Sequence, residues 1–199
     1  MIVTVAPPST VVRRPRRTRA FTVDEFYRLA AAGFLGPNHQ RLELIEGEIL
    51  EPMPIGPAHA AAVTRIYSIF NKAVGNRFIV RSQNPVQLGQ FSQPLPDISV
   101  VRQRDDSYRT AHPGAGDVLL LIEVADSTLE FDLGEKGRTY AEAAIVEYWV
   151  VDLAGERLRV FRRPVGGEFT ETRLAGRDET IQPLAIPEFS IGVHELLSS

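Results

Sequence analysis

The chain of 199 residues contains no cysteine. This absence excludes a disulfide framework, a thiolate metal site and a cysteine nucleophile. No apolar run reaches the roughly 18 residues of a membrane-spanning helix. The first apolar stretch is short, is broken by Pro7 and Pro8, and precedes its arginines, which is not the pattern of a signal peptide. The sequence therefore predicts a cytoplasmic protein without membrane contact.

Several common catalytic motifs are also missing from the sequence. It has no glycine-rich phosphate loop, no dinucleotide fingerprint and no Gly-x-Ser-x-Gly elbow. Its aromatic residues do not alternate with basic ones, so the sequence does not indicate a series of stacking positions for single-stranded nucleic acid. The only tryptophan, Trp149, lies in an apolar run and is predicted to be part of the core.

Charge is distributed unevenly along the chain. Residues 1–20 contain five arginines and no acidic residue, which leaves 17 basic and 25 acidic residues, a net charge of −8, in residues 21–199. We expect residues 1–20 to be a disordered basic tail and residues 21–199 to be a single domain. The tail is either a nucleic-acid-binding arm or a solvated leader. The acidic body argues against strong unspecific binding to DNA, because phosphate contacts require cations.

The order of predicted elements indicates an α/β protein with a mixed β-sheet flanked by helices. Two apolar runs, 118–124 and 148–152, are of the kind that is buried on both faces of a sheet. A capping box of Thr22 and Glu25 predicts the start of a helix, and Glu46-Gly47 predicts a hairpin turn. The remaining predicted elements are a helix over 58–74 with Val63, Ile66, Phe70 and Ala73 on its buried face, strands over 78–88 and 97–101, a helix beginning at Lys136, paired strands over 147–153 and 156–164, and a short helix over 193–197.

Two carboxylates interrupt otherwise apolar strands. Asp97 begins the run DISVV, and Glu123 lies within LLLIEVA. A buried charge is costly unless it is paired, neutralised or bound to a metal ion. If the two strands are neighbours, both carboxylates reach one point, where oxygen ligands suit Mg²⁺ or Mn²⁺. The alternative is a structural ion pair.

Three further residues are candidates for the same site. Lys136 follows Glu123 at a distance that allows its ammonium to approach the metal and to orient or deprotonate a water molecule, or to stabilise a phosphate. Its alternative is an exposed lysine in a first helical turn. Glu43 lies on an early strand, and His59 begins the next helix, so either one extends the site. For His59 the alternative is a surface or supporting role.

These residues lie within longer segments that resemble a known protein family. The segments RLELIEGEI, PAHAAAV, LPDISVV and LLLIEVADSTLEFDLGEKGRTYAEAAIVEYWVVDL, in this order, resemble the Uma family of restriction-endonuclease-like proteins. The similarity covers about residues 21–197, and Leu119 to Leu153 is its most specific part. The resemblance implies the core of the PD-(D/E)xK nucleases, in which two acidic residues hold a metal ion and a lysine assists the hydrolytic water.

The resemblance also implies roles for individual residues. Asp97 and Glu123 are the metal-binding carboxylates, and the backbone carbonyl of Val124 is a further ligand. The sequence departs from the superfamily pattern because Ala125, not lysine, stands two residues after Glu123. The resemblance then implies that Lys136 on the following helix supplies the lysine. Four further residues match family positions, namely Glu43, His59, Asp132 and Tyr140. Asp132 is expected to have a structural role near a helix start. Tyr140 is expected to line or support the site.

The sequence thus predicts an endonuclease that hydrolyses DNA with Mg²⁺ or Mn²⁺. The alternative is a non-catalytic binding or assembly module that keeps the nuclease fold, which the acidic body and Ala125 favour. Activity on RNA is also open. A homodimer is possible, since two-fold dimers are the commonest assemblies, and the hairpin over residues 150–161 is the candidate edge.

Overall fold

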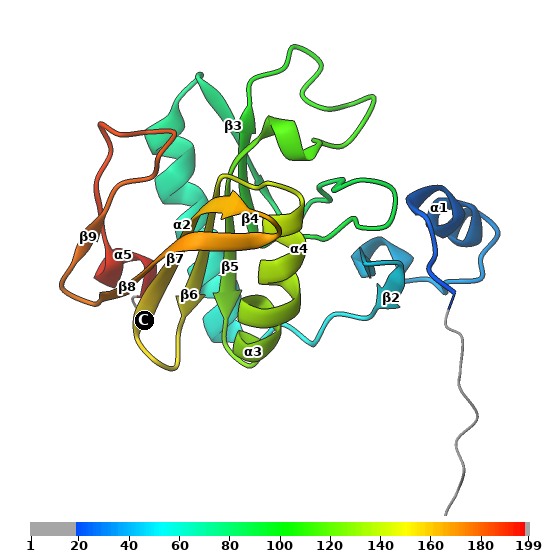
Figure 1. The fold of residues 1–199 in the computed structure, drawn as a ribbon, viewed down its shortest axis with the longest axis horizontal. Helices are drawn as coiled ribbons and strands as arrows, with labels where there is room; N and C mark the ends of the chain where they lie inside the picture. Colours follow the sequence, from blue (N-terminus) through cyan, green and yellow to red (C-terminus); the bar gives the residue numbers. More distant parts are fainter. Residues whose placement is uncertain (1–18, 198–199) are drawn as a thin grey trace, which may run out of the picture.

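A mixed β-sheet is the centre of the computed structural model, which describes residues 19–197. Within these residues, six strands lie in the order β3-β4-β5-β6-β7-β8, and all neighbours are antiparallel except β5 and β6. The strands are β3 (Phe78–Ser82), β4 (Ile98–Arg102), β5 (Val118–Ala125), β6 (Glu147–Asp152), β7 (Arg157–Val165) and β8 (Glu168–Gly176). The predicted fold class, a mixed sheet flanked by helices, is confirmed (Figure 1).

The parallel pair β5–β6 requires a crossover connection, and a helical segment provides it. This segment consists of α3 (Leu129–Phe131), the π-helical η3 (Asp132–Lys136) and α4 (Gly137–Glu142). The helix predicted to begin at Lys136 therefore begins seven residues earlier, and Lys136 lies in its middle. The physical reason is packing, because Leu129 and Leu133 both contact the hydrophobic core.

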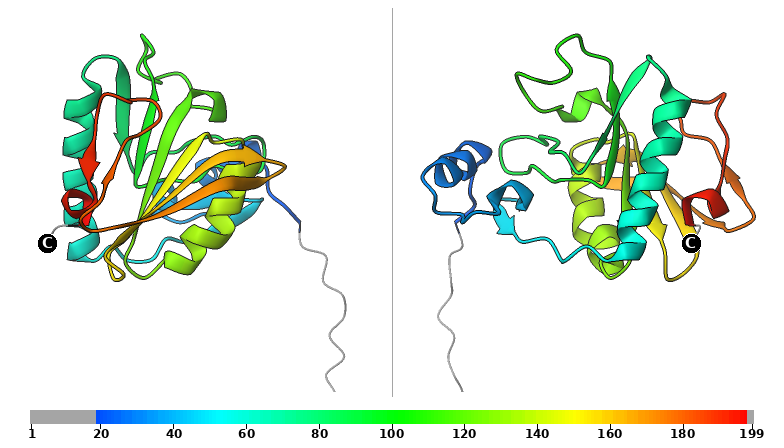
Figure 2. Two further views of the ribbon diagram at one scale, coloured as in Figure 1. Left: turned by 60° about the vertical axis from the view of Figure 1, so that its left-hand side comes forward. Right: turned by 180° about the vertical axis from the view of Figure 1, so that it is seen from behind.

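Helices cover both faces of the sheet, as the two views in Figure 2 show. On one face α2 (Pro57–Val74) and α5 (Val193–Leu197) pack over a core that includes Trp149, which is fully buried as predicted. On the other face α4 packs against a core that includes Tyr140 and Tyr148. The buried face of α2 differs from the prediction, because Ala62 and Val74 are buried and Ala73 only partly so.

The N-terminal elements form a small unit beside the main sheet (Figure 1). Helix α1 (Val23–Ala31) begins at the predicted capping box of Thr22 and Glu25. The 3₁₀ helix η1 (His39–Arg41) leads into the predicted hairpin of β1 (Glu43–Ile45) and β2 (Glu48–Leu50), whose turn residues Glu46 and Gly47 both have positive φ. Residues 51–56 then connect β2 to α2.

The two outer strands of the main sheet are β3 and β8. The hairpin over residues 150–161 was the candidate dimer edge, and this prediction is wrong because β8 pairs with β7 from Arg157 to Val165. A two-stranded ribbon of β9 (Thr180–Ile181) and β10 (Ile191–Gly192) precedes α5. No helix among residues 19–197 is long and apolar enough to cross a membrane. The predicted basic tail falls almost entirely outside the described residues, since these begin at Arg19.

Candidate active site

A cleft of about 670 Å³ lies between the N-terminal unit and the end of the main sheet. Its walls come from η1, β1, residues 50–56, the first turn of α2, the end of β5 and the segment α3–η3. All five residues predicted for the site line this cleft, namely Asp97, Glu123, Lys136, Glu43 and His59. The tertiary structure thus brings together side chains that are up to 93 positions apart in the chain.

Asp97 is joined by two hydrogen bonds to β5, one with the side chain of Glu123 and one with the backbone of Val124. Ile98 pairs with Ile122 in the antiparallel register of β4 and β5, and this register brings Asp97 close to Glu123. The backbone N–H of Asp97 donates to Oε2 of Glu123 over 3.3 Å. The backbone N–H of Val124 donates to Oδ2 of Asp97 over 2.9 Å. Asp97 was predicted to begin its strand, but it lies one residue before β4, where its side chain can face the cleft.

The carboxylate of Glu123 is held in the sheet, where only 3% of the residue is exposed. Burial raises its pKa to about 8, although the ammonium of Lys136 opposes this rise. Oε1 accepts hydrogen bonds from Lys136 Nζ over 3.0 Å and from the Tyr140 hydroxyl over 2.7 Å. With the Asp97 N–H on Oε2, three donors therefore compensate the buried carboxylate.

Lys136 is buried between two carboxylates and is not an exposed surface lysine. Only 6% of the residue is exposed. Its Nζ lies 3.0 Å from Glu123 Oε1 and 3.1 Å from Glu43 Oε1. Burial lowers its pKa, but the attraction of Glu123 and Glu43 outweighs this effect, so the net pKa is raised. Lys136 consequently stays an ammonium at neutral pH and can donate hydrogen bonds but cannot act as a base.

Glu43 and His59 each contact another part of the site. Oε1 of Glu43 accepts from the N–H of Leu95 over 2.7 Å, in addition to its ion pair with Lys136. Nε2 of His59 lies 3.0 Å from Oδ2 of Asp97. This hydrogen bond raises the pKa of His59, while burial opposes the rise. Both residues thus restrain the carboxylates of the site, either directly or through the lysine.

The two family-matched residues outside this group also lie nearby. Asp132 is the first residue of η3, is buried, and accepts from the Thr128 hydroxyl over 2.6 Å. It therefore lies near the start of the helical segment, three residues after Leu129, as the resemblance implies. Burial raises its pKa, and Lys136 opposes the rise. Tyr140 is fully buried, packs edge-on against the ring of Tyr148, and supports the site by donating a hydrogen bond to Glu123.

Sequence reasoning missed two residues of the cleft. Gln83 donates from Nε2 to Oδ1 of Asp97 over 3.2 Å. The pairing of Ser82 with Ile98 brings Gln83 beside Asp97, so only knowledge of the strand register would have found it. Arg41, in η1, lies on the cleft rim, is exposed, and makes no ion pair within residues 19–197. The position of Arg41 in the sequence does not indicate that it belongs to the site.

The donor set of the cleft matches the preferences of a hard divalent cation. In the described part of the chain, no group of three or more His, Cys, Asp or Glu side chains is arranged to hold a metal ion. Mg²⁺ does not need such a group, because one or two carboxylates and several water molecules usually bind it. Asp97 and Glu123 provide two carboxylates within one hydrogen-bonded pair. The Val124 N–H contacts Asp97, while its carbonyl as a ligand stays a prediction.

Replacing Lys136 tests the balance of charges in the cleft. We expect Lys136→Met to lower the free energy of unfolding by roughly 3–5 kcal/mol, because Glu123 and Glu43 lose their buried cation. Urea denaturation measures this change. The matched control is Lys72→Met, the other lysine of the chain, which is exposed on α2 and should change the stability by less than about 0.5 kcal/mol. Equal stability of the two variants would contradict the buried ion-pair network.

Comparison with known proteins supports the same fold. A solved structure from Anabaena variabilis ATCC 29413, described as that of "a putative nuclease belonging to DUF820", is similar to this chain with a TM-score of 0.71. The match covers 89% of this chain and 98% of that one, at 22% sequence identity, so the likeness concerns the fold. None of the curated proteins matches the chain. The model of the family Uma2, described as "Putative restriction endonuclease", matches residues 23–194, and the chain therefore belongs to this family.

Proposed function

We propose that this protein is a cytoplasmic endonuclease that hydrolyses DNA phosphodiesters with Mg²⁺ or Mn²⁺. The observation that carries this proposal is the pair of hydrogen bonds that holds Asp97 against Glu123 and Val124 at the cleft, with Lys136 beside Glu123. Membership of a family described as "Putative restriction endonuclease" supports it. Two carboxylates can bind the cation that such hydrolysis uses, and a neighbouring ammonium can stabilise charge on the phosphate.

In the proposed reaction, Asp97 and Glu123 hold the cation. When bound, the cation polarises a phosphate oxygen and lowers the pKa of a water molecule. The water oxygen attacks phosphorus and releases one proton to solvent, the bond from phosphorus to the leaving sugar oxygen breaks, and the leaving oxygen takes up a proton from solvent. Lys136 keeps its proton, so it orients the water or stabilises charge on the phosphate by donating hydrogen bonds. Glu43 restrains the lysine, and His59 and Gln83 restrain Asp97.

Arg41 is the residue we assign to a DNA phosphate next to the reaction centre. The side chains lining the cleft include six carboxylates but only two strong cations among the described residues, Lys136 and Arg41. Lys136 is already paired with Glu43 and Glu123, whereas Arg41 is exposed and makes no ion pair with another described residue. An arginine can bind a phosphate through two parallel hydrogen bonds. Arg41 thus offsets part of the repulsion between the acidic cleft and the substrate.

The excess of carboxylates also favours a second candidate, a non-catalytic binding module with the same fold. Residues 21–199 have a net charge of −8, which opposes the approach of a polyanion. A module of this kind binds a partner of another chemistry and shows no salt-dependent affinity for DNA. The predictions that follow separate it from the enzyme.

The first prediction concerns the two carboxylates. Purified wild-type protein should nick supercoiled plasmid with Mg²⁺ or Mn²⁺. Asp97→Asn and Glu123→Gln should each lose more than the roughly 100-fold that removal of a supporting residue costs at a metal site. Gel electrophoresis follows the nicking, and circular dichroism checks the fold. Glu130→Gln, a change at an exposed carboxylate outside the cleft lining, is the control and should leave cleavage unchanged. Undiminished nicking by either folded carboxylate variant would refute the assignment.

The second prediction concerns pH. Because burial raises the pKa of Glu123 to about 8, protons compete with the cation below this pH. The affinity for Mg²⁺ should therefore rise between about pH 6.5 and about pH 8, by up to tenfold for each unit, and then level off. Isothermal titration calorimetry at several pH values measures this affinity. An affinity that does not change over this range would show that the carboxylate is already ionised at the lower pH.

The third prediction concerns Arg41. The change Arg41→Gln should weaken binding to duplex DNA and lower the slope of log affinity against log salt by about 1, because one phosphate contact is lost. Fluorescence anisotropy at several salt concentrations gives the slope. Arg109→Gln removes an exposed arginine that is outside the cleft lining and should not change the slope. If both variants retain the wild-type slope, Arg41 does not contact phosphate.

A further inference from the structure

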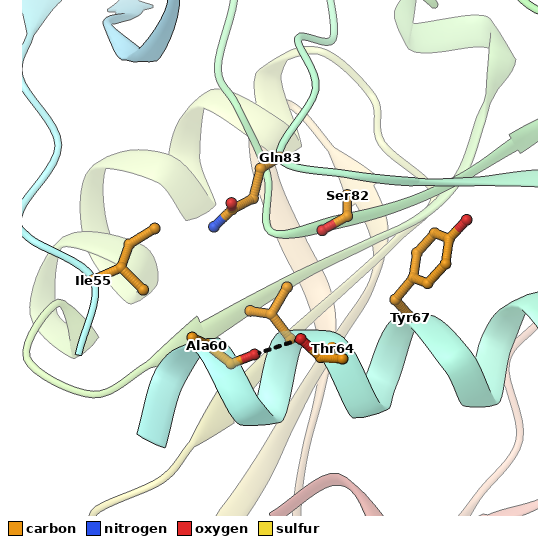
Figure 3. A pocket seen from close by; sticks show the side chains of 7 residues that line it. Ile55, Ala60, Thr64, Tyr67, Ser82 and Gln83 are labelled. Atoms are coloured by element: carbon orange, nitrogen blue, oxygen red, sulfur yellow. Dashed lines mark hydrogen bonds between the residues drawn. The ribbon is translucent and has the colours of Figure 1, made fainter. Parts of the chain in front are cut away.

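A second cavity opens beside the proposed active site. It has a volume of about 290 Å³ and lies between α2 and the residues that end β3. Figure 3 shows Ala60, Thr64 and Tyr67 on the helix side and Ser82 and Gln83 opposite them, with Ile55 and Tyr67 toward the two ends. We call this cavity the side groove.

The side groove adjoins the cleft. Ile55 and Gln83 line both cavities and form the boundary between them. Gln83 also donates to Oδ1 of Asp97 over 3.2 Å. One end of the groove is therefore only one side chain away from a proposed metal ligand. A group that enters the side groove must belong to a molecule that lies very near the reaction centre.

The chemistry of the side groove is opposite to that of the cleft. Among the described residues, seven line the groove, and none of them carries a charge. The tyrosine and aliphatic side chains provide apolar surface, and the hydroxyl and carboxamide groups provide donors and acceptors. The lining of the groove contains no cation that could bind a phosphate. It matches the chemistry of a nucleobase, which has flat apolar faces and an edge of hydrogen-bonding groups.

Tyr67 is the residue best placed to contact such a base. It is 37% exposed, and neither its ring nor its hydroxyl contacts a hydrogen-bonding or aromatic partner among residues 19–197. Aromatic side chains of this kind provide stacking surfaces for unpaired bases. Ser82, across the groove, likewise has a side-chain hydroxyl without a protein partner in the described structure. Both hydroxyls are available to the edge of a base.

We propose that the side groove binds the base of the nucleotide adjacent to the phosphate that is cleaved, and that Tyr67 stacks on it. This inference rests on the proposed nuclease function and specifies its substrate. A base that is paired in a duplex is stacked between its neighbours and cannot enter the groove, so it must be unpaired or turned out of the helix. The protein consequently prefers DNA with unpaired nucleotides at the cleavage position.

Binding without divalent metal tests the side groove independently of cleavage. The two probes, at low salt, are a fluorescent oligothymidylate and an abasic DNA strand of the same length. Wild-type protein should bind the thymidylate strand more tightly. In Tyr67→Ala this preference should fall by about 5- to 150-fold, the range that corresponds to the loss of one base–aromatic stack. The change Phe34→Ala, at an aromatic residue that is 78% exposed and outside both cavities, should preserve it.

Cleavage of paired and unpaired DNA separates this inference from the proposed function. Wild-type protein should cleave an oligonucleotide duplex with an unpaired central bubble faster than the fully paired duplex, and Tyr67→Ala should lose this preference. Cleavage at equal rates, or equal affinity of wild-type protein for the thymidylate and abasic strands, overturns the side groove as a base site even if the protein is a nuclease. Base-dependent binding that requires Tyr67, without any cleavage, would support the side groove as a base-binding site and would reject the proposed nuclease activity.

Discussion

The buried carboxylate of Glu123 is the constraint on which the rest of the site depends. A strand that is apolar on both sides of this residue can be central to a sheet only if the charge is compensated. The structure meets this need with the ammonium of Lys136, the hydroxyl of Tyr140 and the N–H of Asp97. Each of these groups comes from a different element, so compensation of one charge also fixes the positions of α4, η3 and the start of β4. The same group of residues forms the candidate active site.

The crossover between β5 and β6 explains how the lysine reaches this position. Two parallel neighbours cannot be joined by a tight turn, and the connecting helix must pass over one face of the sheet. The π-helical segment η3 lies in this crossover, and Lys136 is its last residue. Such segments are rare and often occur at functional sites. The protein thereby obtains a lysine beside Glu123, even though the position two residues after Glu123 is occupied by Ala125.

Charge divides the two adjoining cavities into distinct chemical environments. The cleft contains carboxylates, the buried Lys136 and the rim residue Arg41, whereas the side groove has no charged lining residue. A nucleotide has the same division, because its phosphate is anionic and its base is uncharged and flat. Ile55 and Gln83, which line both cavities, mark the boundary between the two environments. The arrangement thus matches one nucleotide that has its phosphate in the cleft and its base in the groove.

The sequence by itself determined the fold class and most of the elements, but not the start of the crossover helix. Local signals are sufficient for this, because a capping box acts within one helical turn and a buried strand is recognised by its own apolar residues. The sequence also singled out Asp97 and Glu123, since a carboxylate in an apolar run is anomalous without any knowledge of its neighbours. Only the tertiary structure decided that Lys136 is buried, that Gln83 contacts Asp97, and that Tyr67 faces a groove. These facts depend on strand register and on contacts between distant segments, and the periodicity of a single segment contains neither.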